Sequence, residues 1–235
     1  MSWMTNRLVI RLRSVGRILK INRLLDYFFT SRNYEDRFKS ILLEACREGD
    51  CVWDIGANIG YYSNLFSEKV GPNGCVYAFE PSPTNREKFI THHIMADNVV
   101  LMAYALGDRQ ANVMLRQGAD FIGATSSIVD SKTTKDGQVI SVKMIRGDTL
   151  IFSEEVRSPN VIKIDVEGYE LEVLRGFGQT LLINRELRLL GIEVHFGILT
   201  SRGIPKVPAV IESMLNETGF ECCWCDASHL VARRG

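Results

Sequence analysis

Acidic residues and one histidine stand where short apolar segments of the sequence end. They are Asp54, Glu80, Asp165, Glu167, Glu193 and His195. Carboxylates and imidazoles accept hydrogen bonds, exchange protons and bind metal ions, so a reaction site would use such side chains. Because ligands sit at the carboxyl ends of the strands in a parallel sheet, we expect these residues to surround one ligand.

A glycine-punctuated turn, Asp-Ile-Gly-Ala-Asn-Ile-Gly, occupies residues 54–60 between a predicted strand and a predicted helix. Gly56 permits a sharp turn, and Gly60 permits close packing or close approach by a ligand. A dinucleotide-binding turn would have a glycine at position 58 to admit a pyrophosphate, and Asn58 stands there instead. The turn therefore favours a nucleoside ligand without phosphates. Asp54 suits a ligand that carries positive charges.

Glu80 lies twenty residues after Gly60, at the end of the next apolar segment. A carboxylate near this spacing accepts hydrogen bonds from both hydroxyls of a ribose. Adenosylmethionine fits these features, because it has a ribose, no phosphate, and a tail with ammonium and sulfonium charges. A nicotinamide-dependent oxidoreductase of the Rossmann type is the alternative, although the missing middle glycine argues against it. A cofactor-binding protein without turnover is a further alternative.

Two pairs of polar residues further along the chain are suited to proton transfer. Asp165 and Glu167 are two residues apart, as are Glu193 and His195, so each pair shares one side of an extended strand. We expect His195, whose ordinary pKa lies near neutrality, and Asp165 to act as catalytic groups toward a hydroxyl acceptor. A carboxylate acceptor would need no base. A divalent metal ion held by Asp165 and its neighbours is an alternative, but the spacing does not require one, and none is predicted.

Five stretches of the sequence, in the same order, resemble the FkbM-type methyltransferases, which use adenosylmethionine. They are VWDIGANIGYYS (52–63), VYAFEPSP (76–83), ALGD (105–108), IKIDVEGYE (162–170) and IEVH (192–195). The resemblance implies the class I methyltransferase fold, a doubly wound, mostly parallel, seven-stranded α/β sheet whose last strand is antiparallel. It also implies methyl transfer, usually to an oxygen of a small molecule, a sugar or a lipid- or glycan-linked acceptor.

The resemblance also assigns residues of this chain to parts of the cofactor. The methionine end would be held by Asp54, Gly56, Ala57, Asn58 and Gly60, the ribose by Glu80 next to Pro81, and the adenine by Ala105 and Leu106. Asp165 would also contact the cofactor, and Asp165 and His195 would lie beside the cofactor pocket, where a base should be. The resemblance leaves the choice of acceptor open.

The elements that position these residues alternate between short apolar strands and helices. Strands are predicted at residues 51–55, 75–79, 99–106, 161–164 and 187–194, with a closing hairpin at 220–225 and 230–233. Helices are predicted at residues 34–48, 61–69, 84–95, 169–175 and 209–218. Two more strands, 111–115 and 139–145, flank a long polar loop. This alternation predicts a parallel sheet with both faces covered by helices.

The composition is that of a globular protein with one domain. Of its 235 residues, 46% are hydrophobic and 24% charged, and the net charge is zero, which excludes a disordered chain. The longest apolar run, residues 99–106, is too short for a membrane span. Six cysteines are too few for a disulfide scaffold, and Cys222 and Cys225 with His229 lack the usual four zinc ligands. We therefore expect free thiols in a reducing compartment.

The charge is distributed unevenly between a basic N-terminal helical arm, residues 1–47, and a methyltransferase domain, residues 48–235. The arm has ten basic and four acidic residues, a net charge of +6 that leaves −6 for the rest. The acidic remainder argues against a nucleic-acid partner. The arm either packs on its own domain, contacts another subunit or lies on an anionic membrane. Since no secretion signal is evident, we expect a cytoplasmic protein, with peripheral membrane contact as an option.

Overall fold

The computed structural model describes residues 31–92, 96–116, 127–129 and 139–235. Residues 1–30 of the basic arm lie outside the described residues, so its contact with a membrane or another subunit stays a prediction. Within the described ranges, no helix combines the length and the hydrophobicity needed to cross a bilayer.

The described residues form a seven-stranded sheet with the order β10-β11-β9-β8-β1-β2-β3. Its strands are β1 (Cys51–Ile55), β2 (Cys75–Phe79), β3 (Val99–Met102), β8 (Val161–Ile164), β9 (Leu189–Glu193), β10 (Phe220–Trp224) and β11 (His229–Arg234). Strands β1, β2, β3, β8 and β9 run parallel, whereas β11 is antiparallel to β9 and to β10. The sheet is doubly wound and mostly parallel, with an antiparallel last strand, so the predicted fold class is confirmed.

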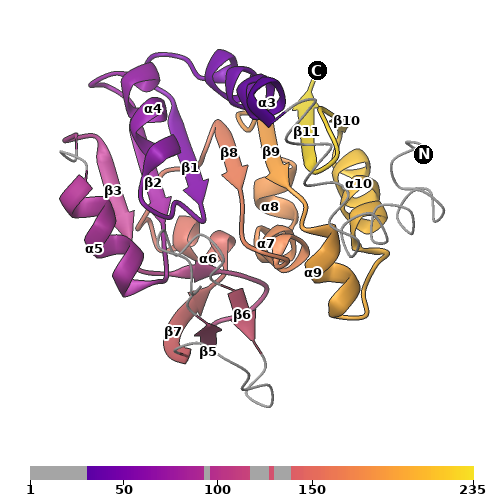
Figure 1. The fold of residues 1–235 in the computed structure, drawn as a ribbon. Coiled ribbons are helices and arrows are strands. Elements are labelled where there is room, and N and C mark those ends of the chain that lie inside the picture. The colour runs from indigo at the N-terminus through magenta and orange to yellow at the C-terminus, as the bar shows by residue number, and fades with distance from the viewer. Residues whose placement is uncertain (1–30, 93–95, 117–126, 130–138) are drawn as a thin grey trace.

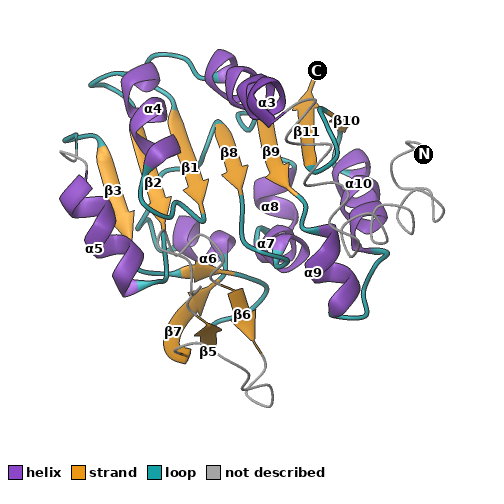
Figure 2. Ribbon diagram, in the orientation of Figure 1, coloured by secondary structure: helices purple, strands orange, loops and turns teal. Residues whose placement is uncertain are grey.

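Helices cover both faces of this sheet (Figures 1 and 2). One face carries α3 (Ser31–Ala45), α4 (Tyr61–Val70) and α5 (Pro83–His92). The other carries α6 (Gly147–Phe152), α7 (Glu170–Gly176), α8 (Gly178–Leu182), α9 (Phe196–Ser201) and α10 (Val207–Glu217). Strand β1 is apolar except for Asp54, because both of its sides are covered: Trp53 packs into one layer and Val52 into the other, and both are fully buried.

Helix α3 belongs to the core of the domain, although the sequence divided the chain at residue 47. Phe38 and Leu42 are buried against β9, where Gly191 leaves room for them. A Cβ atom on Gly191 would come within 2.8 Å of Leu42 and 2.9 Å of the Phe38 ring. The last part of the predicted arm therefore packs on its own domain.

A second, four-stranded sheet lies at the carboxyl edge of the main sheet (Figure 1), and the sequence did not predict it as a separate sheet. Its strands are β4 (Ala105–Leu106), β5 (Ala111–Arg116), β6 (Ser127–Val129) and β7 (Val139–Ile145). The prediction of one strand over residues 99–106 is wrong, because β3 ends at Met102 and β4 pairs with β7 instead. A small apolar core that includes Val113, Leu115 and Met144 holds the second sheet together.

Candidate active site

A cleft opens between the carboxyl ends of β1, β2 and β8 and the second sheet. Its lining includes Gly56, Asn58, Glu80, Pro81, Ala105, Leu106, Asp165 and Glu167, together with Phe79, Asn85, Tyr104, Leu115, Ile128 and Tyr169. The predicted cofactor residues from four separate stretches of the chain therefore meet in one place. The second sheet supplies the apolar wall of the cleft.

The turn after β1 is shaped by Gly56, which has a φ of 78°. A Cβ atom there would lie 1.8 Å from the carbonyl oxygen of Asp165, so only glycine fits. The Gly56 N–H donates to the Phe79 carbonyl (3.0 Å), and its own carbonyl accepts from Lys163 Nζ (3.2 Å). These contacts fix the turn against β2 and β8.

Glu80 is held at the floor of the cleft by backbone donors. The Asn58 N–H donates to Oε2 (2.9 Å), and the Ser82 N–H donates to Oε1 (2.8 Å). Only 4% of the residue is exposed, and this burial raises the pKa of Glu80 to about 7 despite the two hydrogen bonds. Each oxygen accepts one hydrogen bond and has a second lone pair, so the carboxylate can accept two more donors from a ligand.

Asn58, which lines the cleft, has a side-chain acceptor without a partner in the described part of the chain. Its side-chain Oδ1 is buried and has no hydrogen-bond partner among the described residues. Asn58 has a φ of 52°, in the left-handed region that asparagine tolerates better than most residues. A buried carbonyl oxygen without a donor favours a ligand that brings one, such as an ammonium or hydroxyl group.

Lys163 is a buried cation beneath the cleft that sequence reasoning missed. Its Nζ lies 3.2 Å from Asp54 Oδ1, 3.5 Å from Asp165 Oδ2 and 5.0 Å from the centre of the Tyr62 ring. Burial alone would lower the pKa of Lys163, but the charges of Asp54 and Asp165 outweigh it and raise the pKa above its ordinary value. The lysine within the apolar strand sequence VIKI could have indicated this role, because a lysine in a buried strand needs an acidic partner.

Three predicted cofactor residues do not line the cleft. Asp54 is fully buried and accepts a hydrogen bond from Ser63 Oγ (2.7 Å), in addition to its ion pair with Lys163. Ala57 packs into the layer beneath the turn, and Gly60 lies against the Phe89 ring, which a Cβ atom would approach to 2.7 Å. The Asp54 carboxylate is ion-paired with Lys163, and its contact with a ligand stays a prediction. These residues build the turn.

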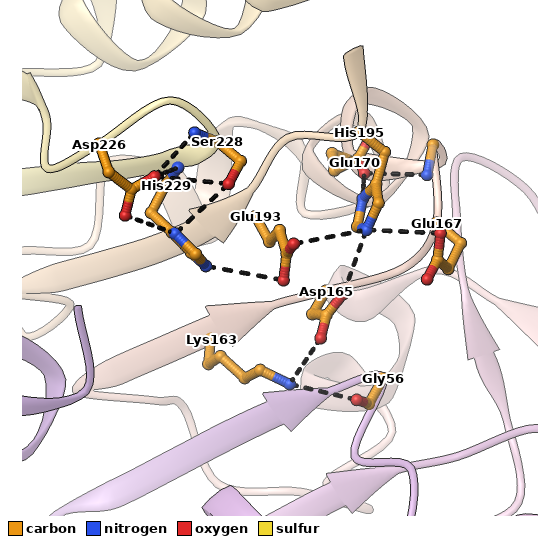
Figure 3. A network of polar contacts seen from close by, with 11 residues as sticks. Gly56, Lys163, Asp165, Glu167, Glu170, Glu193, His195, Asp226, Ser228 and His229 are labelled. Atoms are coloured by element: carbon orange, nitrogen blue, oxygen red, sulfur yellow. Dashed lines mark hydrogen bonds and ion pairs between the residues drawn. The ribbon is translucent and has the colours of Figure 1, made fainter. Parts of the chain in front are cut away.

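His195 lies behind the cleft within a ring of carboxylates (Figure 3). Its Nδ1 is 2.7 Å from Glu170 Oε1. Its Nε2 is 3.4 Å from Glu167 Oε2, 3.6 Å from Asp165 Oδ1 and 3.8 Å from Glu193 Oε1. The two predicted pairs after β8 and β9 therefore converge, although only Asp165 and Glu167 line the cleft.

The electrostatics of His195 differ from the expectation of a near-neutral pKa. Burial lowers the pKa of the imidazole, but the hydrogen bond to Glu170 and the charges of Glu167 and Asp165 outweigh burial and raise it to about 9. Burial also raises the pKa of Glu167, to about 7. Without a bound cation, the imidazole thus carries a proton at neutral pH and is not poised as a general base.

Glu170, which holds His195, was also missed by sequence reasoning. An acidic residue in the first turn of a helix is common because it complements the helix dipole, so its position gave no distinct signal. His229 contacts Asp226 (2.7 Å) and Glu193 (3.6 Å) (Figure 3), so its imidazole is engaged by acids rather than by Cys222 and Cys225. All six cysteines are free thiols.

The family profile described as "Methyltransferase FkbM domain" matches residues 54–222. The chain is similar to the hexuronic acid methyltransferase AglP of Haloferax volcanii, with 33% identity over 67% of this chain and 61% of that protein. It is also similar to the 31-O-demethyl-FK506 methyltransferase FkbM of Streptomyces tacrolimicus, with 27% identity over 55% of this chain and 60% of that protein. The match thus spans less than two thirds of each of these relatives.

Solved structures with the same fold include two proteins of low sequence identity. One is assigned as an rRNA methylase from Clostridium thermocellum (TM-score 0.51, 11% identity, 88% of this chain and 99% of that chain). The other is assigned as a caffeoyl-CoA O-methyltransferase from Staphylococcus aureus (TM-score 0.50, 13% identity, 96% and 98%). At this level of identity the likeness concerns the fold alone.

Proposed function

This chain belongs to the FkbM methyltransferase family, and from that premise we propose that it transfers a methyl group from adenosylmethionine to an oxygen of a sugar or another small or lipid- or glycan-linked acceptor. The observation that carries the proposal is the cleft that Glu80 and Asn58 line together with apolar residues of the second sheet. Family membership also decides against the nicotinamide-dependent alternative.

The residues of the cleft fit adenosylmethionine. Glu80 has two free lone pairs for the ribose hydroxyls, and Asn58 Oδ1 is an unpaired acceptor for a donor on the ligand, such as the ammonium group. Ala105, Leu106 and Ile128 offer apolar surface for the adenine. When bound, the cofactor supplies a methyl group that is already activated on a sulfonium, so the protein mainly aligns the acceptor.

The acceptor oxygen would lie against Asp165 and Glu167, which line the cleft. A hydroxyl acceptor donates a hydrogen bond to one of these carboxylates and loses its proton there as the new bond forms. In the absence of a bound cation, His195 acts as a positioning residue that orients the two carboxylates through Nε2. A sugar acceptor is supported by the likeness to a hexuronic acid methyltransferase.

Calorimetric titration tests the cofactor assignment. The protein should bind adenosylhomocysteine and not NADH. Glu80→Ala should weaken that binding about tenfold or more, because hydrogen bonds to a charged group are lost. Glu87→Ala is the matched control, since Glu87 is exposed on α5 beside the cleft residues. Unchanged affinity in Glu80→Ala, with an unaltered circular dichroism spectrum, would contradict the ribose assignment.

Methyl transfer itself is tested with methyl-labelled adenosylmethionine and a panel of hexuronic acids, neutral sugars and lipid-linked glycans. We expect label on an acceptor oxygen. Binding of adenosylhomocysteine without label on any acceptor, or on any molecule of a native cell extract, would favour a cofactor-binding protein without turnover.

A further inference from the structure

We propose that Asp165, Glu167 and His195 form a binding site for one divalent metal ion at the inner end of the cleft. Each residue offers one ligand atom, and the three atoms all lie within 4.8 Å of one another. Ligands at about 2.1–2.6 Å from a metal ion are at most about 5 Å apart, so one ion can contact all three. The role of the ion in catalysis rests on the proposed function, whereas its binding does not.

The imidazole is held in the orientation that metal coordination requires. Glu170 is fully buried and contacts Nδ1 of His195 at 2.7 Å, which directs Nε2 at the carboxylates (Figure 3). A carboxylate behind a metal-binding histidine fixes the ring and strengthens it as a ligand. Coordination through Nε2 needs the neutral imidazole, so binding of the ion releases a proton.

The cluster has an excess of negative charge that a cation would offset. Four carboxylates surround the imidazole, those of Asp165, Glu167, Glu170 and Glu193. The second oxygen of the buried Glu170 carboxylate has no hydrogen-bond partner among the described residues. Within the described part of the chain, the cations that face these acids from other elements are Lys163, 3.5 Å from Asp165, and His229, 3.6 Å from Glu193. Buried carboxylates in excess of their partners favour a further cation.

The donor set selects the class of metal ion. Two carboxylate oxygens and one imidazole nitrogen suit a divalent ion that accepts both, such as Mn²⁺. Glu193 Oε1, 3.8 Å from the same Nε2, is a further oxygen within reach of small movements. Because Asp165 and Glu167 line the cleft, the remaining positions of the ion would face the acceptor, where a Lewis acid favours deprotonation of a hydroxyl.

Mn²⁺ binding is measured by the loss of the electron paramagnetic resonance signal of the free ion, without any cofactor present. We expect one ion per chain. Glu167→Gln removes a ligand and Glu170→Gln removes the support of His195, so each should weaken binding about tenfold or more. Glu172→Gln is the matched control. This substitution also removes one negative charge from the same segment, but Glu172 pairs with Arg202 (2.7 Å) instead of contacting His195. It should bind as the wild type does.

The inference is overturned if the wild-type protein leaves the free signal unchanged at about 1 mM Mn²⁺, or if all three variants bind equally. Where Glu167→Gln lowers the melting temperature sharply, Asp165→Asn takes its place in the comparison. Adenosylhomocysteine binding with no Mn²⁺ binding would reject the metal site and leave the proposed function intact. Mn²⁺ binding with no adenosylhomocysteine binding would support the metal site and reject the proposed function.

Discussion

Glu80 is a carboxylate whose charge is supported almost entirely by the backbone. Two N–H groups, one from the turn after β1 and one from the segment after β2, point at its two oxygens. Burial nevertheless raises the pKa of Glu80 to about 7, so desolvation outweighs these bonds. The folded state therefore binds the proton more tightly than the unfolded chain. The contribution of Glu80 to stability is greatest below the unfolded pKa near 4.5, declines as the pH rises and is lost above about 7.

Adenosylhomocysteine affinity should rise with pH because of Glu80. With a pKa of about 7, the ionised fraction grows from about one tenth at pH 6 to about nine tenths at pH 8. Ribose hydroxyls bind the ionised form more strongly, so we expect an affinity increase of about tenfold across this range. Calorimetry at pH 6, 7 and 8 measures it. Glu80→Gln should remove the increase, and an equally steep increase in that variant would assign it to another group.

Lys163 joins two acidic residues that the sequence treated as separate ligands. Its ammonium group contacts the carboxylates of Asp54 and Asp165, while it also donates to the Gly56 carbonyl. Burial of an ion pair carries a desolvation cost. Here the ammonium group offsets this cost by contacting three segments of the chain at once. The lysine thus couples the turn after β1 to the end of β8, which is the edge where the cleft opens.

At the scale of elements, the turn between β1 and α4 depends on a glycine for two separate reasons. Gly56 has a positive φ, and its missing side chain admits the Asp165 carbonyl. Gly203 has nearly the same φ, 75°, but a Cβ atom there would meet nothing within 4 Å. Alanine substitutions at the two positions therefore distinguish the free-energy cost of a positive φ from the additional cost of steric overlap.

Gly203→Ala should lower the free energy of unfolding by about 1–2 kcal/mol, the cost of a left-handed alanine. Gly56→Ala should lower it by at least about 2 kcal/mol more, because β8 must also move away from the turn. Urea unfolding measures both. Equal losses in the two variants would mean that the Asp165 carbonyl shifts freely, and that the turn is less tightly held than the contacts indicate.

The second sheet arises where an apolar run changes partner. Residues 99–106 look like one strand, because every residue in the run is hydrophobic. The chain instead leaves the main sheet after Met102 and enters the second sheet at Ala105, where it pairs with Met144 of β7. This change of partner carries Ala105 and Leu106 to the wall of the cleft.

At the scale of the whole molecule, the sheet is buried between two helical layers, and α3 completes one of them. Phe38 is 1% exposed and packs in the same cluster as Leu42 and Val161. Phe38→Ala should lower the free energy of unfolding by about 3–5 kcal/mol. Phe152→Ala is the control, because Phe152 is 70% exposed, and it should change stability by less than about 0.5 kcal/mol. Similar effects of both substitutions would place α3 outside the cooperative core.

The sequence by itself determined the parallel strands at the core of the molecule and the part of the site that follows β1 and β2. The bounds of β1, β2 and β8 could be predicted, because short apolar runs flanked by turn residues indicate buried strands whichever partners they take. Gly56 and Glu80 could be placed for the same reason, since each follows directly from a strand end. The position of Asp54 in the sequence, in contrast, did not reveal that this residue is fully buried and does not line the cleft.

Only the tertiary structure decided how distant segments meet. It brought Lys163 to Asp54, the second sheet to the cleft, and His195 into a ring of carboxylates. It thereby changed the charge state expected of that histidine and assembled a cation site that no spacing along the chain required. The physical reason is that local patterns fix backbone conformation and burial, whereas pKa values and ligand geometry depend on charges a few ångströms apart in space.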